Sequence, residues 1–212
     1  MSKRVFFGFI AICFVAFIIF QKSIIFSNKV KEPIPFKDGD YLEYSHDLAF
    51  NSGLKSDQGI SFNYTVNRVA DSNFKIIEKS LYYTDRKNVH ENDIYSGNTI
   101  EADKYGKILK VVDSIGGIPE NFIGHDINFW LPASRRNIGE KIYSQEFSNE
   151  FSISKKTIWG KWDVWEAYNK ENGFDYYLYY ETNGGFLVGY VYKTNAGVTT
   201  STLIDTNLDI NH

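Results

Sequence analysis

Apolar and polar residues alternate along most of the chain after residue 36. Ile60, Phe62, Tyr64 and Val66 fall on one face of an extended segment, and the residues between them are polar. A period of two is typical of a strand that buries one face. Weaker alternation covers residues 41–50, 74–84, 99–104 and 107–112. The pattern therefore predicts antiparallel strands and no long helix.

Tight-turn sequences divide the carboxy-terminal third of the chain into hairpins. Gly160-Lys161 suits a two-residue turn whose first residue has a positive φ. Further turn signals stand at Asn172-Gly173, Asn183-Gly184-Gly185 and Asn195-Ala196-Gly197. These turns predict strands at residues 162–168, 174–181, 186–193 and 198–207.

The segment 114–137 breaks the alternation, and Pro119 suits the first turn of a short helix. Such a helix would be a connection that crosses the sheet. We expect a mainly β fold in which about ten strands form one antiparallel, strongly curved meander sheet. The sheet would be a half-barrel or a sandwich with one short helical crossover.

The first thirty residues have a different pattern. Residues 5–20 are uninterruptedly apolar, and residues 24–26 resume the run after Lys22. About 20 apolar residues span a bilayer, and Lys22 can extend its ammonium to the headgroups. We predict a cytoplasmic segment at residues 1–4 and a signal-anchor transmembrane helix at 5–26, held in the lipid bilayer. A linker at 27–36 and an extracytoplasmic β-domain at 37–212 would follow.

Two other interpretations of the amino terminus stay open. A cleaved secretory signal would end near Ser27, and a lipoprotein signal would use Cys13. The apolar run is longer than most cleaved signals have, and Ile12 stands where lipoprotein signals carry a small residue. The amino-terminal flank of four residues favours the orientation with the long domain outside.

Charge and cysteine content exclude several classes of protein. Residues 1–30 hold four of the 23 basic residues and no acid, so the remainder carries 19 basic against 26 acidic residues, net −7. An acidic domain without a basic cluster does not attract nucleic acid. The single cysteine excludes a disulfide scaffold and multi-cysteine metal sites. The four histidines show no metal-binding spacing, so we expect no metal and no cofactor.

Aromatic residues make up 17% of the chain, and several strands carry them on both faces. Such rings can cover the rim of a sandwich, line a groove for an apolar, lipid-like ligand, or dock on another protein. The candidate contact residues are Trp130, Trp159, Trp162, Trp165, Tyr177 and Tyr179.

No motif indicates catalysis, and we expect no catalytic residue. An envelope hydrolase is the alternative, with a carboxylate pair drawn from Glu166, Asp175 and Glu181. Asn63, in Asn63-Tyr64-Thr65, is a candidate acceptor for an N-linked glycan.

Short pieces of the chain are similar to known proteins. The run 176–189, the segment 36–44 and Trp130-Leu131-Pro132 resemble a β-repeat pattern of uncharacterised membrane-anchored or secreted archaeal proteins. The expected fold is similar to the half-barrels of lipoprotein carriers. The resemblance implies location and architecture, and no activity. We expect a membrane-tethered accessory domain that binds a protein partner in a membrane or cell-surface complex, or alternatively an apolar ligand.

Overall fold

The computed structural model describes residues 31–50, 59–70, 73–83, 94–115, 123–144, 147 and 149–208. The chain divides into two units, Met1–Lys31 and Glu32–His212, and only Lys31 of the first unit is described. The predicted span at 5–26, Cys13 and the predicted helix start at Pro119 lie outside the described residues. Within the described ranges, no helix has the length and apolar character needed to cross a membrane.

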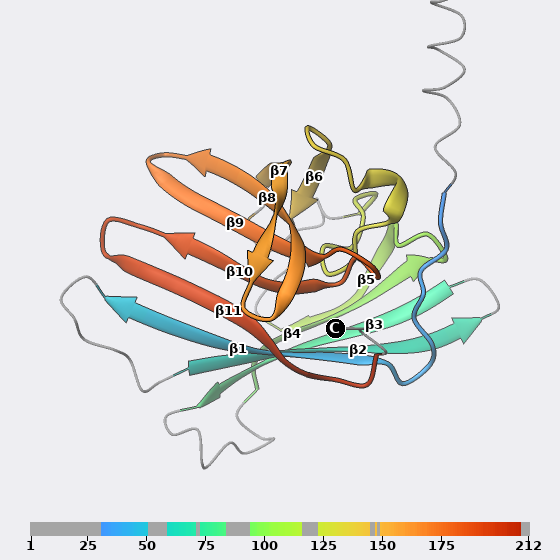
Figure 1. The fold of residues 1–212 in the computed structure, drawn as a ribbon. Coiled ribbons are helices and arrows are strands. Elements are labelled where there is room, and N and C mark those ends of the chain that lie inside the picture. Colours follow the sequence, from blue (N-terminus) through green and yellow to red (C-terminus); the bar gives the residue numbers. More distant parts are fainter. Residues whose placement is uncertain are drawn as a thin grey trace, which may run out of the picture. The chain divides into compact units, whose positions relative to one another are not determined.

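Antiparallel strands build the second unit (Figure 1). The described strands are β1 Tyr41–Phe50, β2 Gly59–Ala70, β3 Asn73–Tyr83, β4 Ile94–Asp103, β5 Ile108–Ile115, β6 Lys141–Ser144, β7 Asn149–Trp159, β8 Trp162–Glu171, β9 Phe174–Glu181, β10 Leu187–Lys193 and β11 Gly197–Thr206. A 3₁₀ turn, η2 at Ala133–Arg135, follows Pro132. The prediction of a mainly β, antiparallel fold is confirmed.

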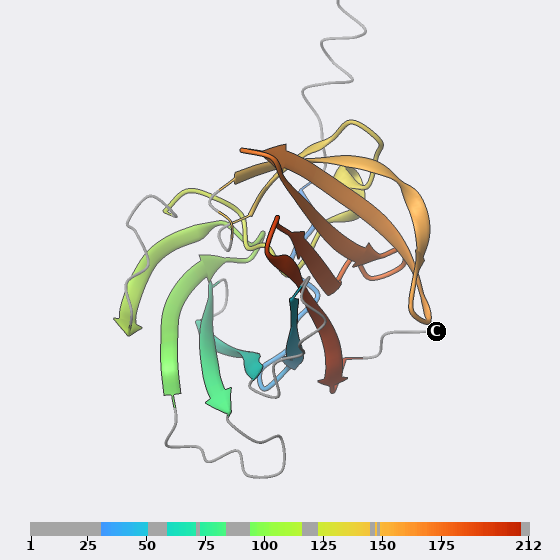
Figure 2. The same cartoon turned by 90° about the vertical axis from the view of Figure 1, so that its left-hand side faces the viewer.

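The strands form one sheet in the order β5-β4-β3-β2-β1-β11-β10-β9-β8-β7-β6. Two meanders, β1 to β5 and β6 to β11, are joined by the pairing of β1 with β11. Figure 2 shows the strands curling around an interior, as in a half-barrel. Consecutive strands β5 and β6 therefore lie at the two edges of the sheet, and the chain between them must connect those edges.

That connection carries a plug of five consecutive buried residues, 127–131. A strand exposed on one face would bury only alternate residues, so a continuous buried run means enclosure from several sides. The Leu187 N–H donates to the Phe129 carbonyl at 2.9 Å, and the Leu131 N–H donates to the Gly185 carbonyl at 2.8 Å. The Tyr180 hydroxyl donates to the Asn128 carbonyl at 2.7 Å. The plug thus fills the interior beside β9 and β10.

The chain just before β1 belongs to the same core. Ile34 and Phe36, which lie in the predicted linker, are only 6% and 5% exposed. The Ile34 N–H donates to the Lys104 carbonyl, and the Phe36 ring packs edge-on against Phe129 and Phe186. The β-domain therefore begins before residue 37, because these two side chains complete its hydrophobic packing.

The face of β9 and β10 opposite the plug is covered by the β7–β8 hairpin. Gly160 has a φ of +56°, as its place in the two-residue turn predicts. The Trp159 ring beside that turn stacks on Tyr179 with 4.2 Å between centroids. A Cβ on Gly189 would lie 2.7 Å from the Trp159 indole nitrogen, so the hairpin end reaches β10.

Candidate functional site

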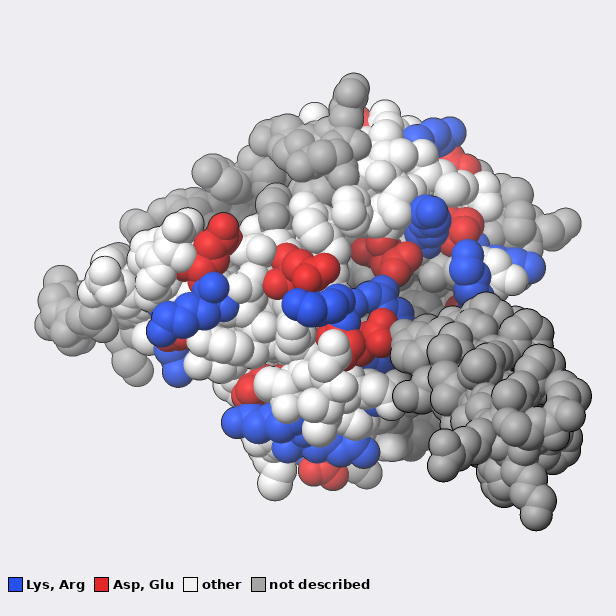
Figure 3. Space-filling model, turned by 90° about the horizontal axis from the view of Figure 1, so that it is seen from above, with Lys and Arg blue, Asp and Glu red and all other residues white. Residues whose placement is uncertain are grey.

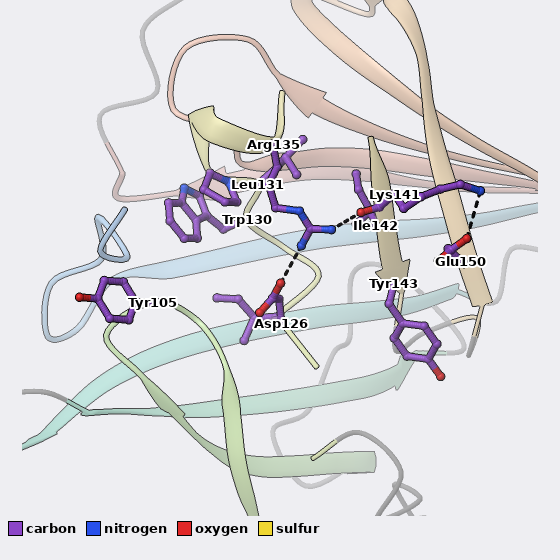
Figure 4. A pocket seen from close by; sticks show the side chains of 11 residues that line it. Tyr105, Asp126, Trp130, Leu131, Arg135, Lys141, Ile142, Tyr143 and Glu150 are labelled. Carbon is purple, nitrogen blue, oxygen red and sulfur yellow. Dashed lines mark hydrogen bonds and ion pairs between the residues drawn. The ribbon is translucent and has the colours of Figure 1, made fainter. Parts of the chain in front are cut away.

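A pocket of about 220 Å³ opens between β6 and the β4–β5 turn (Figure 4). We call it the seam pocket because it lies where the two edges of the sheet approach each other. Its apolar lining comes from Ile127, Trp130, Leu131, Pro132 and Ile142. Its rim comes from Tyr105, Asp126, Arg135, Lys141, Tyr143 and Glu150.

The plug and β6 supply the apolar lining. Ile127 and Leu131 are buried in the plug, and Ile142 is buried on β6. The Trp130 indole N–H donates to the Gly184 carbonyl at 3.0 Å, which satisfies the polar atom of this ring. The pocket therefore offers carbon surface below a polar rim.

Arg135, at the end of η2, bridges the opening of the seam pocket. Its guanidinium pairs with Asp126 at 2.6 Å and with Glu140 at 3.4 Å. It also donates a hydrogen bond to the backbone carbonyl of Lys141 (Figure 4). Through these side-chain interactions, Arg135 joins Asp126, next to the plug, to the backbone of Lys141 in β6.

The charges of the rim neutralise one another. The Lys141 ammonium lies 3.0 Å from the Glu150 carboxylate, beside the Arg135–Asp126 pair. Figure 3 shows basic and acidic side chains interspersed on the face viewed from above. The pocket therefore has no strong preference for one sign of ligand charge.

The backbone of β6 turns alternate polar groups away from β7. The Ile153 N–H donates to the Glu140 carbonyl at 2.9 Å, and Ile142 lies opposite Phe151 in the register with β7. Antiparallel ladders bond every second residue, so Lys141 and Tyr143 direct their N–H and C=O groups away from β7. The Tyr143 ring stacks on His125 with 4.1 Å between centroids.

The size and polarity of the seam pocket limit what it can hold. Pockets for drug-sized ligands usually measure about 300–1,000 Å³. A volume of about 220 Å³ suits a single amino-acid side chain or a small headgroup better than an acyl chain. In the described part of the chain, no group of three or more His, Cys, Asp or Glu residues could hold a metal ion.

The predicted aromatic contact residues do not form one site. Trp159, Tyr179 and Tyr177 form a row, with centroid distances of 4.2 and 6.4 Å between successive rings. Tyr179 is 8% exposed, and burial together with the Glu166 carboxylate raises the pKa of Tyr179 to about 12. This row covers β9 and leaves Tyr177 partly accessible.

The other three tryptophans lie elsewhere. Trp162 is buried at the start of β8, with the Lys161 ammonium 4.7 Å from its ring centroid. Trp165 points to the other face of β8, where Lys156 lies 4.4 Å from its ring. Trp130 is the member of the predicted set that lines the seam pocket.

The three carboxylates of the hydrolase alternative have separate hydrogen-bond partners. Glu166 accepts from the Ser154 hydroxyl, and Asp175 accepts from the Tyr168 hydroxyl, each at 2.7 Å. The Tyr168 bond lowers the pKa of Asp175 and raises the pKa of Tyr168 to about 12. Glu181 accepts two backbone N–H groups of the β9–β10 turn. These contacts orient strand and turn residues.

Asn63, the candidate glycan acceptor, lies in the middle of β2. It is opposite Glu43 of β1 and Lys79 of β3 in the register. Its side chain is outside the described atoms, so glycosylation at this position stays a prediction.

The sequence alone does not indicate Asp126, Arg135 or Tyr143 as site residues. The only sequence signal at the first two is the break in alternation over 114–137, which contains Trp130 and Pro132. Arg135 looks like a solvated surface charge in sequence, because its partners Asp126 and Glu140 become neighbours only when the plug is folded.

Comparison with known proteins was made by family, by sequence and by structure. No family model and no curated protein matches the chain. A hypothetical protein from Chlamydia trachomatis has a TM-score of 0.42 and 10% identity, covering 84% of this chain and 91% of its own. A β-barrel-like protein of a domain of unknown function from Brucella abortus has a TM-score of 0.36 and 8% identity, covering 80% and 98%.

A structure of PNGF-II has a TM-score of 0.35 and 10% identity, covering 81% of this chain and 29% of its own. Likeness at these scores supports no inference about activity. None of these comparisons links the chain to archaeal membrane-anchored proteins, and that resemblance stays a prediction.

Proposed function

We propose that the chain is a membrane-tethered, extracytoplasmic domain without catalysis that docks a protein partner at the seam pocket. The observation that carries this proposal is the position of the pocket. A small pocket with apolar side chains in its lining and a neutral polar rim opens beside β6, an edge strand whose Tyr143 backbone groups point away from β7. Protein contact sites combine such a buried apolar centre with a polar rim.

The described interior favours docking over carriage of a lipid-like ligand. Side chains of the plug and of β9 and β10 fill the space beside them, and Tyr180 and Phe129 are almost completely buried. A carrier of acyl chains needs an open apolar groove in that place. The tether itself rests on the predicted span at 5–26.

Site-specific photo-crosslinking in native membranes tests the docking. A benzophenone amino acid replaces Tyr105 on the pocket rim in the full chain, or Ile204 on β11 as a control. Ile204 is 58% exposed and is not a pocket residue. We expect one stoichiometric adduct from position 105 and none from position 204. Equal labelling at the two positions, or no adduct at 105, would contradict the proposal.

The proposed location has its own test. Protease added to intact cells should digest the β-domain if it lies outside the membrane. Protection of the domain until the membrane is opened would reverse the proposed orientation. Native mass spectrometry of the gently purified chain separates docking from carriage, because a carrier would retain a bound lipid.

A further inference from the structure

We infer that the partner segment is an extended strand that adds to β6 at the edge of the sheet and inserts one apolar side chain into the seam pocket. This inference rests on the proposed function and specifies its partner. The residues that carry it are Tyr143, Ile142 and Arg135, which contribute the backbone edge, the pocket wall and the bridge across the opening.

The backbone of Tyr143 determines the chemistry of the partner. Its N–H and C=O point away from β7, and none of the residues that the structure describes pairs with them. A donor and an acceptor on the same residue match the acceptor and donor of one residue in an antiparallel strand. Addition of a strand to a sheet edge is a recurrent mode of peptide recognition.

The neighbouring edge position is already occupied. Arg135 donates to the Lys141 carbonyl, and the same guanidinium is held by Asp126 and Glu140. Native proteins cover exposed strand edges with charged side chains, which suppresses unselective pairing. The partner strand therefore pairs with Tyr143. It ends or turns away before it reaches Lys141, whose carbonyl is already bonded to Arg135.

Side chains alternate between the two faces of a strand, and this alternation determines where the partner's side chains point. The partner residue opposite Tyr143 points to the same face as the Tyr143 ring. Its neighbours point to the other face, where Ile142 is buried and lines the pocket. A volume of about 220 Å³ accepts one branched aliphatic or aromatic side chain. The partner segment is thus extended, with an apolar residue next to the one that bonds Tyr143.

Two substitutions separate the backbone bond from the loss of the ring. Both Tyr143→Val and Tyr143→Pro remove the ring and its stacking on His125, but only proline removes the N–H. The N–H of Tyr143 is not part of the β6–β7 ladder, and proline is tolerated at such an edge position. We expect the crosslinking yield from position 105 to be about five- to tenfold lower in Tyr143→Pro than in Tyr143→Val, the effect of one hydrogen bond.

Folding of both variants is checked by their urea unfolding midpoints. Ile142→Pro is the contrasting control, because it removes a ladder bond to β7 and should lower the midpoint strongly. Hydrogen exchange in the full chain that carries the benzophenone at position 105 and keeps Tyr143 gives a second measurement. The Tyr143 amide should exchange rapidly in the free chain and at least about tenfold more slowly in the crosslinked complex.

The outcomes distinguish this inference from the proposed function. Equal yields in Tyr143→Val and Tyr143→Pro, with an adduct present, would leave docking in place and overturn strand addition. Absence of an adduct in the chain that carries the benzophenone at position 105 and keeps Tyr143 would overturn both. A slowly exchanging Tyr143 amide in the free chain would show that the chain covers its own edge. An adduct of twice the chain mass would identify a second copy as the occupant, and either result would overturn a separate partner strand.

Discussion

Glu181 is the least exposed charged residue in the described part of the chain, at 3%. Its two carboxylate oxygens accept the N–H groups of Asn183 at 2.7 Å and of Gly185 at 2.5 Å. The Arg136 guanidinium donates to the Gly184 carbonyl of the same turn and to the Leu131 carbonyl of the plug. At the residue scale, one carboxylate and one guanidinium therefore fix the plug to the β9–β10 turn.

Replacement of Glu181 by Gln should lower the free energy of unfolding by about 1–3 kcal/mol, because an amide nitrogen would face a backbone N–H that has lost its acceptor. Urea unfolding measures the change. Glu150→Gln is the control, since Glu150 is exposed and its ion pair with Lys141 should contribute less than about 1 kcal/mol. Equal effects of the two substitutions would refute the assigned role of Glu181.

Burial of His46 should make the stability of the fold depend on pH. Its Nδ1 lies 3.0 Å from the Tyr190 hydroxyl, and burial lowers the pKa of His46 below its usual value of 6.5. The unfolded chain therefore binds a proton more readily than the folded chain. Stability should be complete above about pH 6.5 and should fall as the pH drops toward the folded pKa of His46.

Urea midpoints measured between pH 7 and pH 5 test this expectation. His46→Gln should flatten that part of the profile because no group at position 46 then titrates. An unchanged slope in the variant would assign the acid sensitivity to other groups.

At the scale of elements, turn residues predicted the last four described strands, β8 to β11. Asn172 and Gly173 both have positive φ, as their hairpin turn requires, and the strand predicted at 174–181 coincides with β9. The range predicted at 41–50 coincides with β1. Local backbone preference decides these positions, so the sequence contains the information.

Packing decided what the sequence could not predict. Strict alternation would place Leu187 on the same face as Gly189, but an irregularity between them pairs Leu187 with Tyr180 and Gly189 with Tyr179. The plug at 127–131 shows no alternation of buried and exposed residues because it is enclosed on several sides. The plug supplies Ile127, Trp130 and Leu131 to the seam pocket, and the polar residues of the pocket come together only in the folded sheet.

Position 189 requires glycine because Trp159 and the backbone of Ser201 lie close to β10 at this residue. A Cβ at this position would lie 2.6 Å from the Ser201 carbonyl and 2.7 Å from the Trp159 indole nitrogen. Gly189→Ala should therefore destabilise the fold by about 1–3 kcal/mol and change the tryptophan emission. In a Trp159→Phe background, the emission change should disappear and part of the destabilisation should persist, because the Ser201 carbonyl stays in place. An emission change that persists would place the contact elsewhere.

At the scale of the whole chain, the described core lies in the second unit. Its buried hydrophobic residues extend from Ile34 to Leu203, within Glu32–His212. The half-barrel is held together by long-range pairs such as β1 with β11 and by the plug between its edges. A chain that begins at residue 32 should therefore contain everything that the fold of this unit requires.

Two truncations test where the domain begins. A chain of residues 32–212 should unfold in urea with one cooperative transition. A chain of residues 37–212 loses Ile34 and Phe36 from the core, and burial of two such side chains contributes about 3–6 kcal/mol. Its midpoint should fall correspondingly or the chain should fail to fold. Equal midpoints for the two chains would show that residues 32–36 belong to the linker predicted at 27–36, and that the contacts of Phe36 with Phe129 and Phe186 add no stability.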